Sequence, residues 1–484
     1  MQPPIADIPV RFARLLLFAS LGLGAFLMLF RLEAFPLRDY DEATYGSIVR
    51  ESLERQELTP LTLRGKPWFL KPPLYFSVAY ESAKLFGFSE WSLRLPSALF
   101  GIFSLLLTYL IALSLTKHRL ASVLAVLVLV CNGAFIEAAR QVRFETALVF
   151  FVLFGAYALL RGFERPIWLI GIGIAGSGAI LTKSLAVLLF FPVIGILTIF
   201  AWRFSYLKRV WFWLGLLLGV LILVPWHLAM DRAFGNAFWN TYILDEAVHR
   251  VTDTIIGKGV TTLTYLRHLL RFAEPWFLFA VAIILYNIKP FWQRPREFLE
   301  AHRGALASLC IASAIFLLFA LAQTKLFYYL VPLYPFLAIT IGYTLAFLIA
   351  QAESALERNA GIFGTILLLC IGFAGSLYFG FHIDDSLGVN AIAKEERALG
   401  LALAPVAQDL PVYAYSHLYW ETIEFYSSGH KVEVLPKPEE RAGAYTLILP
   451  SALQANMQSL VTGDVKALYQ GPGLSLFEVT SPRR

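Results

Sequence analysis

The sequence has few cysteines and few charged residues for its length. Among its 484 residues the only cysteines are Cys131, Cys310 and Cys370, and all of them lie within apolar runs. A disulfide framework or a cysteine-ligated metal site needs more cysteines at closer spacing, so both are excluded. Charged residues make up 15% of the chain, against about a quarter in soluble domains. The composition therefore excludes an ordinary soluble domain.

The charges that are present exclude a nucleic-acid-binding protein. The net charge is +6, but the basic residues are scattered between apolar segments and form no basic patch. Hydrophobic residues make up 58% of the chain, and the mean hydropathy is +0.65. We predict an α-helical polytopic membrane protein with about 11 transmembrane helices, each near the ~20 residues that cross a bilayer. The predicted spans are residues 15–30, 95–115, 120–136, 146–160, 167–181, 185–202, 211–228, 275–289, 305–322, 326–350 and 361–380.

The loops between these spans predict the orientation of the chain in the membrane. Lys and Arg are concentrated in alternate loops, at Lys117, Arg119, Arg161, Arg165, Arg203, Lys208, Arg209, Lys289, Arg294, Arg296 and Arg303. Because such loops are cytoplasmic, the N-terminus is predicted to be cytoplasmic, and the first apolar run is predicted to stay as an uncleaved span. An odd number of spans then puts the C-terminal region outside. We predict a multi-pass protein of the cytoplasmic (inner) membrane with a periplasmic or other extracytoplasmic C-terminal domain.

Hydropathy also divides the chain into two predicted domains. Residues 1–380 form a transmembrane domain that includes an extracytoplasmic loop, 31–92, and residues 381–484 form a small extracytoplasmic α/β domain. Alternating apolar residues predict short strands in that domain, and a helix between the first two of them. The predicted strands are residues 411–416, 431–435, 445–449 and 474–479, and the predicted helix is 418–427.

The most unusual stretch runs from residue 38 to residue 75, because it is rich in charge and aromatic rings beside apolar runs. Asp39 or Asp41 is predicted to cap a helix, with Glu42 in its first turn, where carboxylates suit the helix dipole. The buried face of that helix is predicted to hold Tyr45, Ile48, Val49 and Ser52. The proline-rich loop that follows contains Lys66, Trp68, Phe69 and Lys71. Two interpretations stay open for this loop: a site for a lipid phosphate, or an interfacial segment with snorkelling lysines and aromatic anchors.

Further polar residues occur at the predicted membrane edge on the same side as Asp41. Charges at membrane depth are costly and indicate function. A set of cations with a few carboxylates suits a phosphate-bearing ligand and one acid–base group, although each basic residue alone is typical of a snorkelling span end. The set consists of Glu137, Arg140, Arg143, Glu145, Lys183, Asp245, Glu246, His249, Arg250, Lys325, Tyr328, Tyr329 and Tyr334.

One glycine motif is not interpreted as a nucleotide site. Gly171, Gly173 and Gly176 fit the spacing G-x-G-x-x-G but lie inside an apolar span. No strand precedes them, and no acidic residue follows at the distance that dinucleotide binding requires. Close packing between helices explains these small residues better.

Several short motifs, in this order, resemble the membrane glycosyltransferases that use polyprenyl-phosphate sugars. The resemblance covers roughly residues 10–350 and is greatest to the lipid A aminoarabinose transferases, which are similar in fold to the protein O-mannosyltransferases. It implies a GT-C-like fold. The motifs are DEATY at 41–45, FLKPPLY at 69–75, EWSLRLPSA at 90–98, LTK at 181–183, VPW at 224–226 and TKLFYYLVPLYP at 324–335.

The resemblance also implies roles for individual residues. Asp41 corresponds to the carboxylate at the reacting centre, and the donor-phosphate pocket is implied at Lys71, Lys183 and Arg250, with aromatic positions at Tyr45 and at Tyr328 or Tyr329. The chain departs from the family at three positions: Glu145 replaces an Asp, Leu70 replaces a Glu that is a likely metal ligand, and Thr44 replaces an Arg. No cofactor is predicted, and a divalent metal is disfavoured by Leu70. The departures suggest a different sugar or acceptor.

The predicted function is inverting transfer of a sugar from a polyprenyl-phosphate carrier to a lipid such as lipid A, a glycan or a protein, on the outer face of the cytoplasmic membrane. Asp41 is the predicted general base, and Glu145 is the second predicted catalytic residue. The alternatives are a transporter or flippase for a lipid-linked sugar, and a structural membrane component. The predicted partners are the donor, the acceptor and the bilayer, with no nucleic acid. The predicted substrate-binding residues are Glu42, Tyr45, Lys71, Arg140, Lys183, Glu246, Arg250, Lys325, Tyr328 and Tyr329.

Overall fold

The chain folds into two compact units in the computed structural model. The helical unit comprises Met1–Phe30, Phe69–Tyr75 and Arg94–Phe381, and the mixed unit comprises Arg31–Trp68, Phe76–Leu93 and His382–Arg484. The loop after the first span is therefore grouped with the C-terminal residues, whereas hydropathy grouped it with the spans. The structure describes residues 7–184, 187–201, 203–249, 263, 265–267, 269, 275–322, 325–352, 354–381, 389–407, 410–415, 421–435, 438, 441, 443–461 and 463–481.

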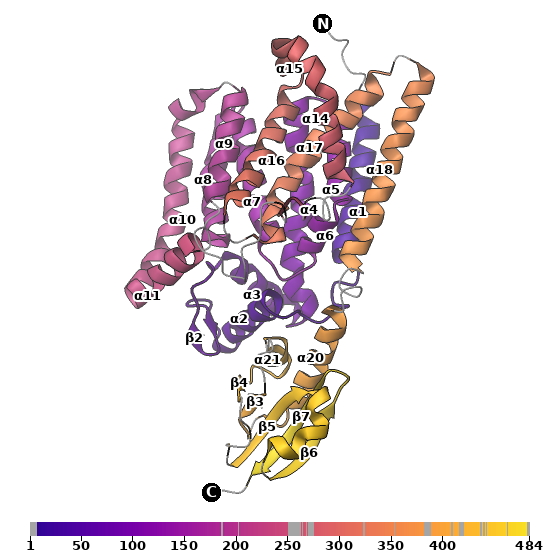
Figure 1. Ribbon diagram of the computed structural model, residues 1–484. Coiled ribbons are helices and arrows are strands. Elements are labelled where there is room, and N and C mark those ends of the chain that lie inside the picture. Colours follow the sequence, from indigo (N-terminus) through magenta and orange to yellow (C-terminus); the bar gives the residue numbers. More distant parts are fainter. Residues whose placement is uncertain are drawn as a thin grey trace. The chain divides into compact units, whose positions relative to one another are not determined.

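The helical unit is a bundle of apolar helices that run roughly side by side, with α15 at one end (Figure 1). Its regular helices are α1 (Val10–Leu29), α4 (Glu90–Thr116), α5 (Arg119–Val130), α6 (Gly133–Ala139), α7 (Glu145–Gly162), α8 (Ile170–Thr182), α9 (Val187–Ala201), α10 (Val210–Phe234), α11 (Asn236–Trp239), α14 (Trp276–Gln293), α15 (Pro295–Ala301), α16 (Arg303–Leu321), α17 (Tyr334–Ala350) and α18 (Ala355–Phe381). Short 3₁₀ segments connect some of them, at η1 (Pro166–Leu169), η3 (Phe204–Lys208) and η5 (Phe327–Leu333), and η4 (Asn240–His249) is a π-helix.

The chain is a multi-pass membrane protein, as predicted. Each of the eleven predicted spans coincides with a helix or a pair of consecutive helices. Among the described residues, eight helices are long and apolar enough to cross a bilayer, or nine if the pair α5 and α6, bent by 67°, is one span. Two further apolar helices, Pro166–Thr182 and Leu188–Ala201, are shorter than a full span. The described residues thus support eight or nine spans, against about 11 predicted, because apolar composition alone does not report helix length or bending.

Close helix packing explains the glycine motif. A Cβ atom on Gly173 of α8 would lie 1.7 Å from the carbonyl oxygen of Gly215 in α10, and one on Gly171 would lie 2.9 Å from Ala158. No side chain fits at the first position, so these glycines allow two helix backbones to touch. The packing interpretation is confirmed.

The mixed unit contains the helices of the first loop and a five-stranded sheet. Its helices are α2 (Asp41–Arg55), α3 (Leu74–Phe86, whose first two residues belong to the helical unit), α20 (Val389–Leu403), α21 (Glu421–Tyr426) and α22 (Met457–Leu460), with a 3₁₀ turn, η7 (Ser451–Asn456). The sheet has the order β4-β3-β5-β7-β6. Its strands are β3 (Val412–Ala414), β4 (Val432–Val434), β5 (Gly443–Pro450), β6 (Asp464–Gln470) and β7 (Leu474–Ser481).

The sheet is mixed, which confirms the predicted small C-terminal α/β domain. Strand β3 pairs in parallel with β4 and β5, while β7 pairs antiparallel with β5 and β6. The four predicted strands and the predicted helix correspond to β3, β4, β5, β7 and α21. Strand β6 and helix α20 were not predicted. The sequence of β6, DVKALYQ, is largely exposed, so it lacks the apolar alternation that identified its neighbours.

The first loop forms its own local structure. Helix α2 buries Tyr45, Ile48, Val49 and Ser52, as the spacing predicted. Neither Asp39 nor Asp41 is its N-cap: the N-cap is Tyr40, and Asp41 and Glu42 lie in the first turn. After α2, strands β1 (Thr62–Leu63) and β2 (Lys66–Pro67) form a hairpin. Its two turn residues have positive φ, the geometry of the tight turns that match the twist of paired strands.

Candidate active site

Both units contain predicted site residues, and the larger group lies in the helical unit. Lys71 and Lys183 both place their ammonium groups near one aromatic ring. The Nζ of Lys71 is 5.8 Å from the ring centroid of Phe144, and the Nζ of Lys183 is 5.3 Å from the same centroid. Lys183 is also 4.3 Å from the ring centroid of Tyr329. Lysines from two distant parts of the sequence therefore meet at one place.

Lys71 is buried and paired with a carboxylate. Its side chain is 7% exposed, and it forms an ion pair with Glu246, whose side chain is 5% exposed. The same ammonium group donates a hydrogen bond to the carbonyl oxygen of Leu70, at 3.2 Å. Glu246 lies on the π-helix η4, a helix type that is frequent at functional sites. Breaking a buried pair of this kind would leave a buried charge, so any anion that replaces Glu246 must itself neutralise Lys71.

A second buried ion pair adjoins the tyrosines of η5. Arg143 donates to Glu145 through Nε at 3.1 Å and through Nη2 at 3.4 Å, which is a bidentate arrangement. The guanidinium carbon of Arg143 lies 3.7 Å from the ring centroid of Tyr328. Glu145 is 1% exposed. Its carboxylate is thus held by Arg143, which suits a role in charge balance and orientation.

Two residues that the sequence did not single out hold this region in place. Ser97 exchanges hydrogen bonds with the backbone of Arg143, and its hydroxyl lies 2.7 Å from the hydroxyl of Tyr75. Phe144 is the ring that the two lysines share. A serine and a phenylalanine in apolar helices are ordinary core residues by composition. Only their position next to Arg143 could have drawn attention to them.

Two other predicted residues, Arg140 and Lys325, are placed differently. Arg140 donates to the carbonyl oxygens of Leu27 and Phe30, at 2.7 and 2.9 Å, so it binds the C-terminal end of α1. Lys325 donates to the carbonyl oxygen of Ala322, at 2.6 Å, in the chain just before η5. The predicted residue Arg250 lies outside the described part of the chain.

The mixed unit contains the predicted base at the start of α2. The hydroxyl of Tyr45 donates to the carboxylate of Asp41 at 3.1 Å, one helical turn away. Glu42 is buried and accepts a hydrogen bond from the backbone of Arg38 at 3.3 Å. Tyr45 packs edge-on against Trp68 and Phe76, so its ring is fixed. Asp41 itself is partly exposed.

The residue before Asp41 has an unusual backbone. Tyr40 has φ 64° and ψ −115°, a region that side-chain-bearing residues rarely adopt. Such conformations cost roughly 1–3 kcal/mol and persist only where the surroundings determine them. They are concentrated at functional sites. Asp41 therefore follows a backbone turn that the fold holds against its local preference.

The donor set does not fit a resident metal ion. Among the described residues, no group of three or more His, Cys, Asp or Glu side chains is placed to hold one. Leu70 stands where the family resemblance implies a carboxylate, and Glu246 is paired with Lys71. We derive no catalytic step through a metal.

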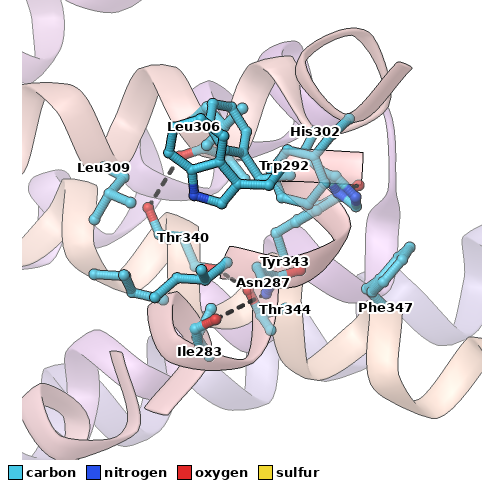
Figure 2. Close-up of a pocket in the computed structure, with 15 residues that line it drawn as sticks. Ile283, Asn287, Trp292, His302, Leu306, Leu309, Thr340, Tyr343, Thr344 and Phe347 are labelled. Atoms are coloured by element: carbon cyan, nitrogen blue, oxygen red, sulfur yellow. Dashed lines mark hydrogen bonds between the residues drawn. The ribbon is translucent and has the colours of Figure 1, made fainter. Parts of the chain in front are cut away.

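A separate cavity of about 220 Å³ lies between α14, α15, α16 and α17 (Figure 2). Its walls are mainly apolar, and several of its polar groups form hydrogen bonds with backbone carbonyls or with each other. Asn287 donates to the carbonyl of Ile283, Thr340 to that of Ala305, and His302 bonds to the hydroxyl of Tyr343. These polar groups are satisfied within the protein, so we assign the cavity no chemistry.

Comparison with known proteins shows which proteins this chain is similar to. Residues 70–228 match the family described as dolichyl-phosphate-mannose-protein mannosyltransferase. The chain is 27% identical over 359 residues to the undecaprenyl phosphate-alpha-4-amino-4-deoxy-L-arabinose arabinosyl transferase of Erwinia tasmaniensis, covering 72% of this chain and 63% of that protein. The chain is related to these membrane glycosyltransferases. An uncharacterised protein of Aquifex aeolicus is similar to it as well, with 26% identity over 70% of this chain and 65% of its own length.

The solved structures give the fold. ArnT from Cupriavidus metallidurans bound to undecaprenyl phosphate matches with a TM-score of 0.73 and 19% identity, covering 98% of this chain and 100% of that one. The predicted fold class and the predicted family resemblance are confirmed. The chain spans a little under two thirds of the length of the curated relatives that it matches.

Proposed function

We propose that the chain is a glycosyltransferase that moves a sugar from a polyprenyl-phosphate carrier to an acceptor hydroxyl on the outer face of the cytoplasmic membrane. The observation behind this proposal is the approach of Lys71 and Lys183 to the ring of Phe144 within an apolar bundle. Two buried or half-buried ammonium groups at one place suit a phosphate, which forms strong charge-assisted hydrogen bonds. The relationship to enzymes named for undecaprenyl-phosphate sugars supports the same ligand.

The proposed reaction needs one base and several cations. The acceptor oxygen attacks the anomeric carbon, the bond from that carbon to the phosphate oxygen breaks, and the acceptor proton passes to Asp41. The carrier phosphate leaves as an anion that Lys71, Lys183 and Arg250 neutralise, so the leaving group needs no proton. Attack from the side opposite the phosphate inverts the configuration. Glu145 acts through Arg143, and Tyr328 and Tyr329 line the cationic region.

Glu246 has a defined part in this proposal. It neutralises Lys71 in the free protein and is displaced, at least partly, when the donor phosphate arrives. Exchange of one anion for another keeps the buried charge of Lys71 balanced throughout. Glu42, Arg140 and Lys325 remain predicted substrate-binding residues, and each of them forms a hydrogen bond with the backbone of its own unit.

The test is a transfer assay on the purified full-length protein in lipid nanodiscs. Undecaprenyl-phosphate donors with different labelled sugars are offered with lipid A, a glycan or a protein acceptor. The proposal is supported if Asp41→Asn abolishes transfer and Glu297→Gln preserves it. Glu297 is a suitable control because it is an exposed carboxylate that pairs only with Arg294 among the described contacts. Movement of the labelled lipid across the bilayer without any transfer would favour the flippase alternative.

A further inference from the structure

A second cavity, of about 280 Å³, lies at the end of the helical unit where α15 is found (Figure 1). Its walls come from the last turns of α4, α7 and α9 and from the first turns of α16, all of which belong to the helical unit. Three of its lining residues, Lys117, Arg203 and Arg303, are cations, and one, Glu164, is a carboxylate. Segments that lie far apart in the sequence thus bring basic side chains to one cavity.

The charges around this cavity are not balanced by the protein. Glu164 is already paired with Arg161, at 2.5 Å. Among the described residues, Lys117, Arg203 and Arg303 form no ion pair with a carboxylate. Like charges that line one cavity repel one another, and a bound anion removes that repulsion. The cavity therefore has a positive lining that suits an anionic ligand.

Helix packing holds two of these cations near each other. A Cβ atom on Gly304 would lie 2.3 Å from the carbonyl oxygen of Leu115, so the start of α16 and the end of α4 touch through their backbones. Arg303 is the first residue of α16, and Lys117 directly follows α4 with φ 56°. The two basic residues are thus attached to backbone segments that are in direct contact, and the basic lining is part of the packed structure.

Apolar residues line the rest of the cavity. Leu197 of α9 and Ala307 of α16 are each 1% exposed, and the guanidinium carbon of Arg203 lies 5.6 Å from the ring centroid of Phe163. An inorganic anion gains nothing from apolar walls, whereas a lipid gains free energy when its first methylene groups are buried. The cavity volume is roughly nine times the ~30 Å³ that one water molecule takes in the liquid, so it can hold more than a phosphate ion.

The cavity is about one membrane thickness away from the cationic residues of the candidate active site. Helix α7 begins at Glu145 and has Phe163, a residue of the cavity wall, as its C-cap. Its 18 residues span about 27 Å, close to the ~30 Å of hydrocarbon in a bilayer. The cavity therefore lies at the other membrane edge, which the sequence predicts to be cytoplasmic. Lipid head groups lie at this depth, and basic pockets between helices there bind anionic ones.

We propose that this cavity binds the head group of an anionic phospholipid, whose phosphate contacts Lys117, Arg203 and Arg303. The ligand bridges the ends of α4, α9 and α16, and its acyl chains continue along the apolar outer surface of the helices. This inference does not depend on the transfer reaction, because Lys71 and Lys183 take no part in the site. Basic residues in these loops also direct the orientation of the chain in the membrane, so the experiment must separate binding in the cavity from that general effect of charge.

The experiment compares two triple variants of the full-length protein that lose the same amount of charge. The cavity variant carries Lys117→Gln, Arg203→Gln and Arg303→Gln. The control variant removes three exposed basic residues of the same predicted side that do not line the cavity: Lys208→Gln, Arg209→Gln and Arg296→Gln. A further variant, Ser114→Phe, places a ring in the cavity wall and leaves the charge unchanged.

Binding is measured on purified, delipidated protein in detergent micelles. Native mass spectrometry gives the affinity for dioleoyl-phosphatidylglycerol, which is anionic, and for dioleoyl-phosphatidylcholine, which has no net charge. Inorganic phosphate is added in excess as a soluble competitor. The midpoint of thermal unfolding is measured with and without each lipid, because a ligand that binds only the folded protein raises it. The midpoint without lipid also shows whether each variant is folded.

We expect the wild type and the control variant to bind the first phosphatidylglycerol about tenfold or more tightly than phosphatidylcholine, and only the anionic lipid to raise the midpoint. We expect the cavity variant and Ser114→Phe to lose this preference. An equal loss of preference in the cavity and control variants overturns the proposal, because general charge would then explain the binding. Wild-type preference in either the cavity variant or Ser114→Phe also overturns it. Displacement of phosphatidylglycerol by inorganic phosphate would show that the cavity takes a free anion and would overturn the assignment to a lipid.

Discussion

Lys71 and Lys183 hold their ammonium groups beside one phenyl ring, at 5.8 and 5.3 Å from the centroid of Phe144. The first lysine comes from the loop before α3, and the second is the C-cap of α8. Like charges at one place in a membrane protein are costly unless they serve an anionic ligand. Glu246 supplies one negative charge in the free protein. A phosphate bound beside Phe144 would meet both lysines.

Removal of either lysine should weaken the donor phosphate site. We expect Lys71→Ala and Lys183→Ala each to reduce the affinity for undecaprenyl phosphate by about tenfold or more, which is about 1.4 kcal/mol. We expect turnover to fall further, because the negative charge on the phosphate grows in the transition state. Calorimetric titration and single-turnover transfer measure the two effects. The control is Lys289→Ala, which changes an exposed lysine of α14. If Lys71→Ala and Lys183→Ala both keep wild-type affinity and turnover, these two lysines are only membrane anchors.

Substitution of the predicted base should remove chemistry and spare binding. Asp41→Asn keeps the size of the side chain and its contact with Tyr45 but cannot accept the acceptor proton. We expect kcat to fall by about 10²–10⁴-fold, the usual range for loss of a general base. Donor affinity, measured by titration with the labelled donor, should stay within a factor of about two. Near-normal turnover would show that another group accepts the proton.

The sequence predicted the membrane class, the helical segments and one helix face, because these depend on local apolar pattern. The buried residues Tyr45, Ile48, Val49 and Ser52 illustrate this. The sequence also predicted Lys71 and Lys183, the two cations beside Phe144, through motifs and through the cost of charge at membrane depth.

The pairings between residues far apart in the sequence could not be predicted. Lys71 and Glu246 are 175 positions apart, and Asp39 and Thr422 are 383 positions apart. No local pattern specifies which of many distant residues will meet. The predicted caps of α2 were wrong for a related reason: Asp39 uses its carboxylate on Thr422, so the backbone of Tyr40 becomes the start of the helix.

Neutralising Glu246 should favour phosphate binding. Glu246→Gln keeps a hydrogen-bond acceptor for Lys71 and removes the carboxylate that competes with the ligand. We expect the affinity for undecaprenyl phosphate to rise by roughly three- to tenfold, or up to about 1.4 kcal/mol. Titration calorimetry measures this change, and Glu297→Gln is the matched exposed control. A loss of affinity would mean that Glu246 contacts the sugar or orients Lys71 for it.

Chelation should leave the activity in place. The described residues offer no cluster of three metal-ligating side chains, and Leu70 cannot bind a cation. In the proposed reaction lysines balance the phosphate charge, so we expect the transfer rate in excess EDTA to stay within about a factor of two of the untreated rate. The assay is repeated with Mg²⁺, Mn²⁺, Ca²⁺ and Zn²⁺ added back. Complete loss that one specific ion restores would show that carboxylates near Asp41 form a metal site.

The packing of α2 on α21 should be sensitive to one added methyl group. A Cβ atom on Gly46 would lie 2.7 Å from both Leu37 and Phe425. We expect Gly46→Ala to destabilise the mixed unit by about 1–3 kcal/mol through overpacking. Thermal unfolding and limited proteolysis of the loop report this change. Gly22→Ala in α1 is the control, since nothing lies within 4 Å of its added Cβ. Equal changes in the unfolding temperature and in proteolysis of the two variants would contradict the packing argument.

The hydrogen bond between Asp39 and Thr422 also constrains the order in which the protein can fold during synthesis. The ribosome makes the loop of Asp41 early, yet the partner of Asp39 on α21 emerges some hundreds of residues later. Chains fold during synthesis in order from the N-terminus, so the early loop waits for a late segment. A prematurely terminated chain that contains every helix of the helical unit would still lack the partner of Asp39. Such a chain would leave the segment just before α2 without one of its native hydrogen bonds.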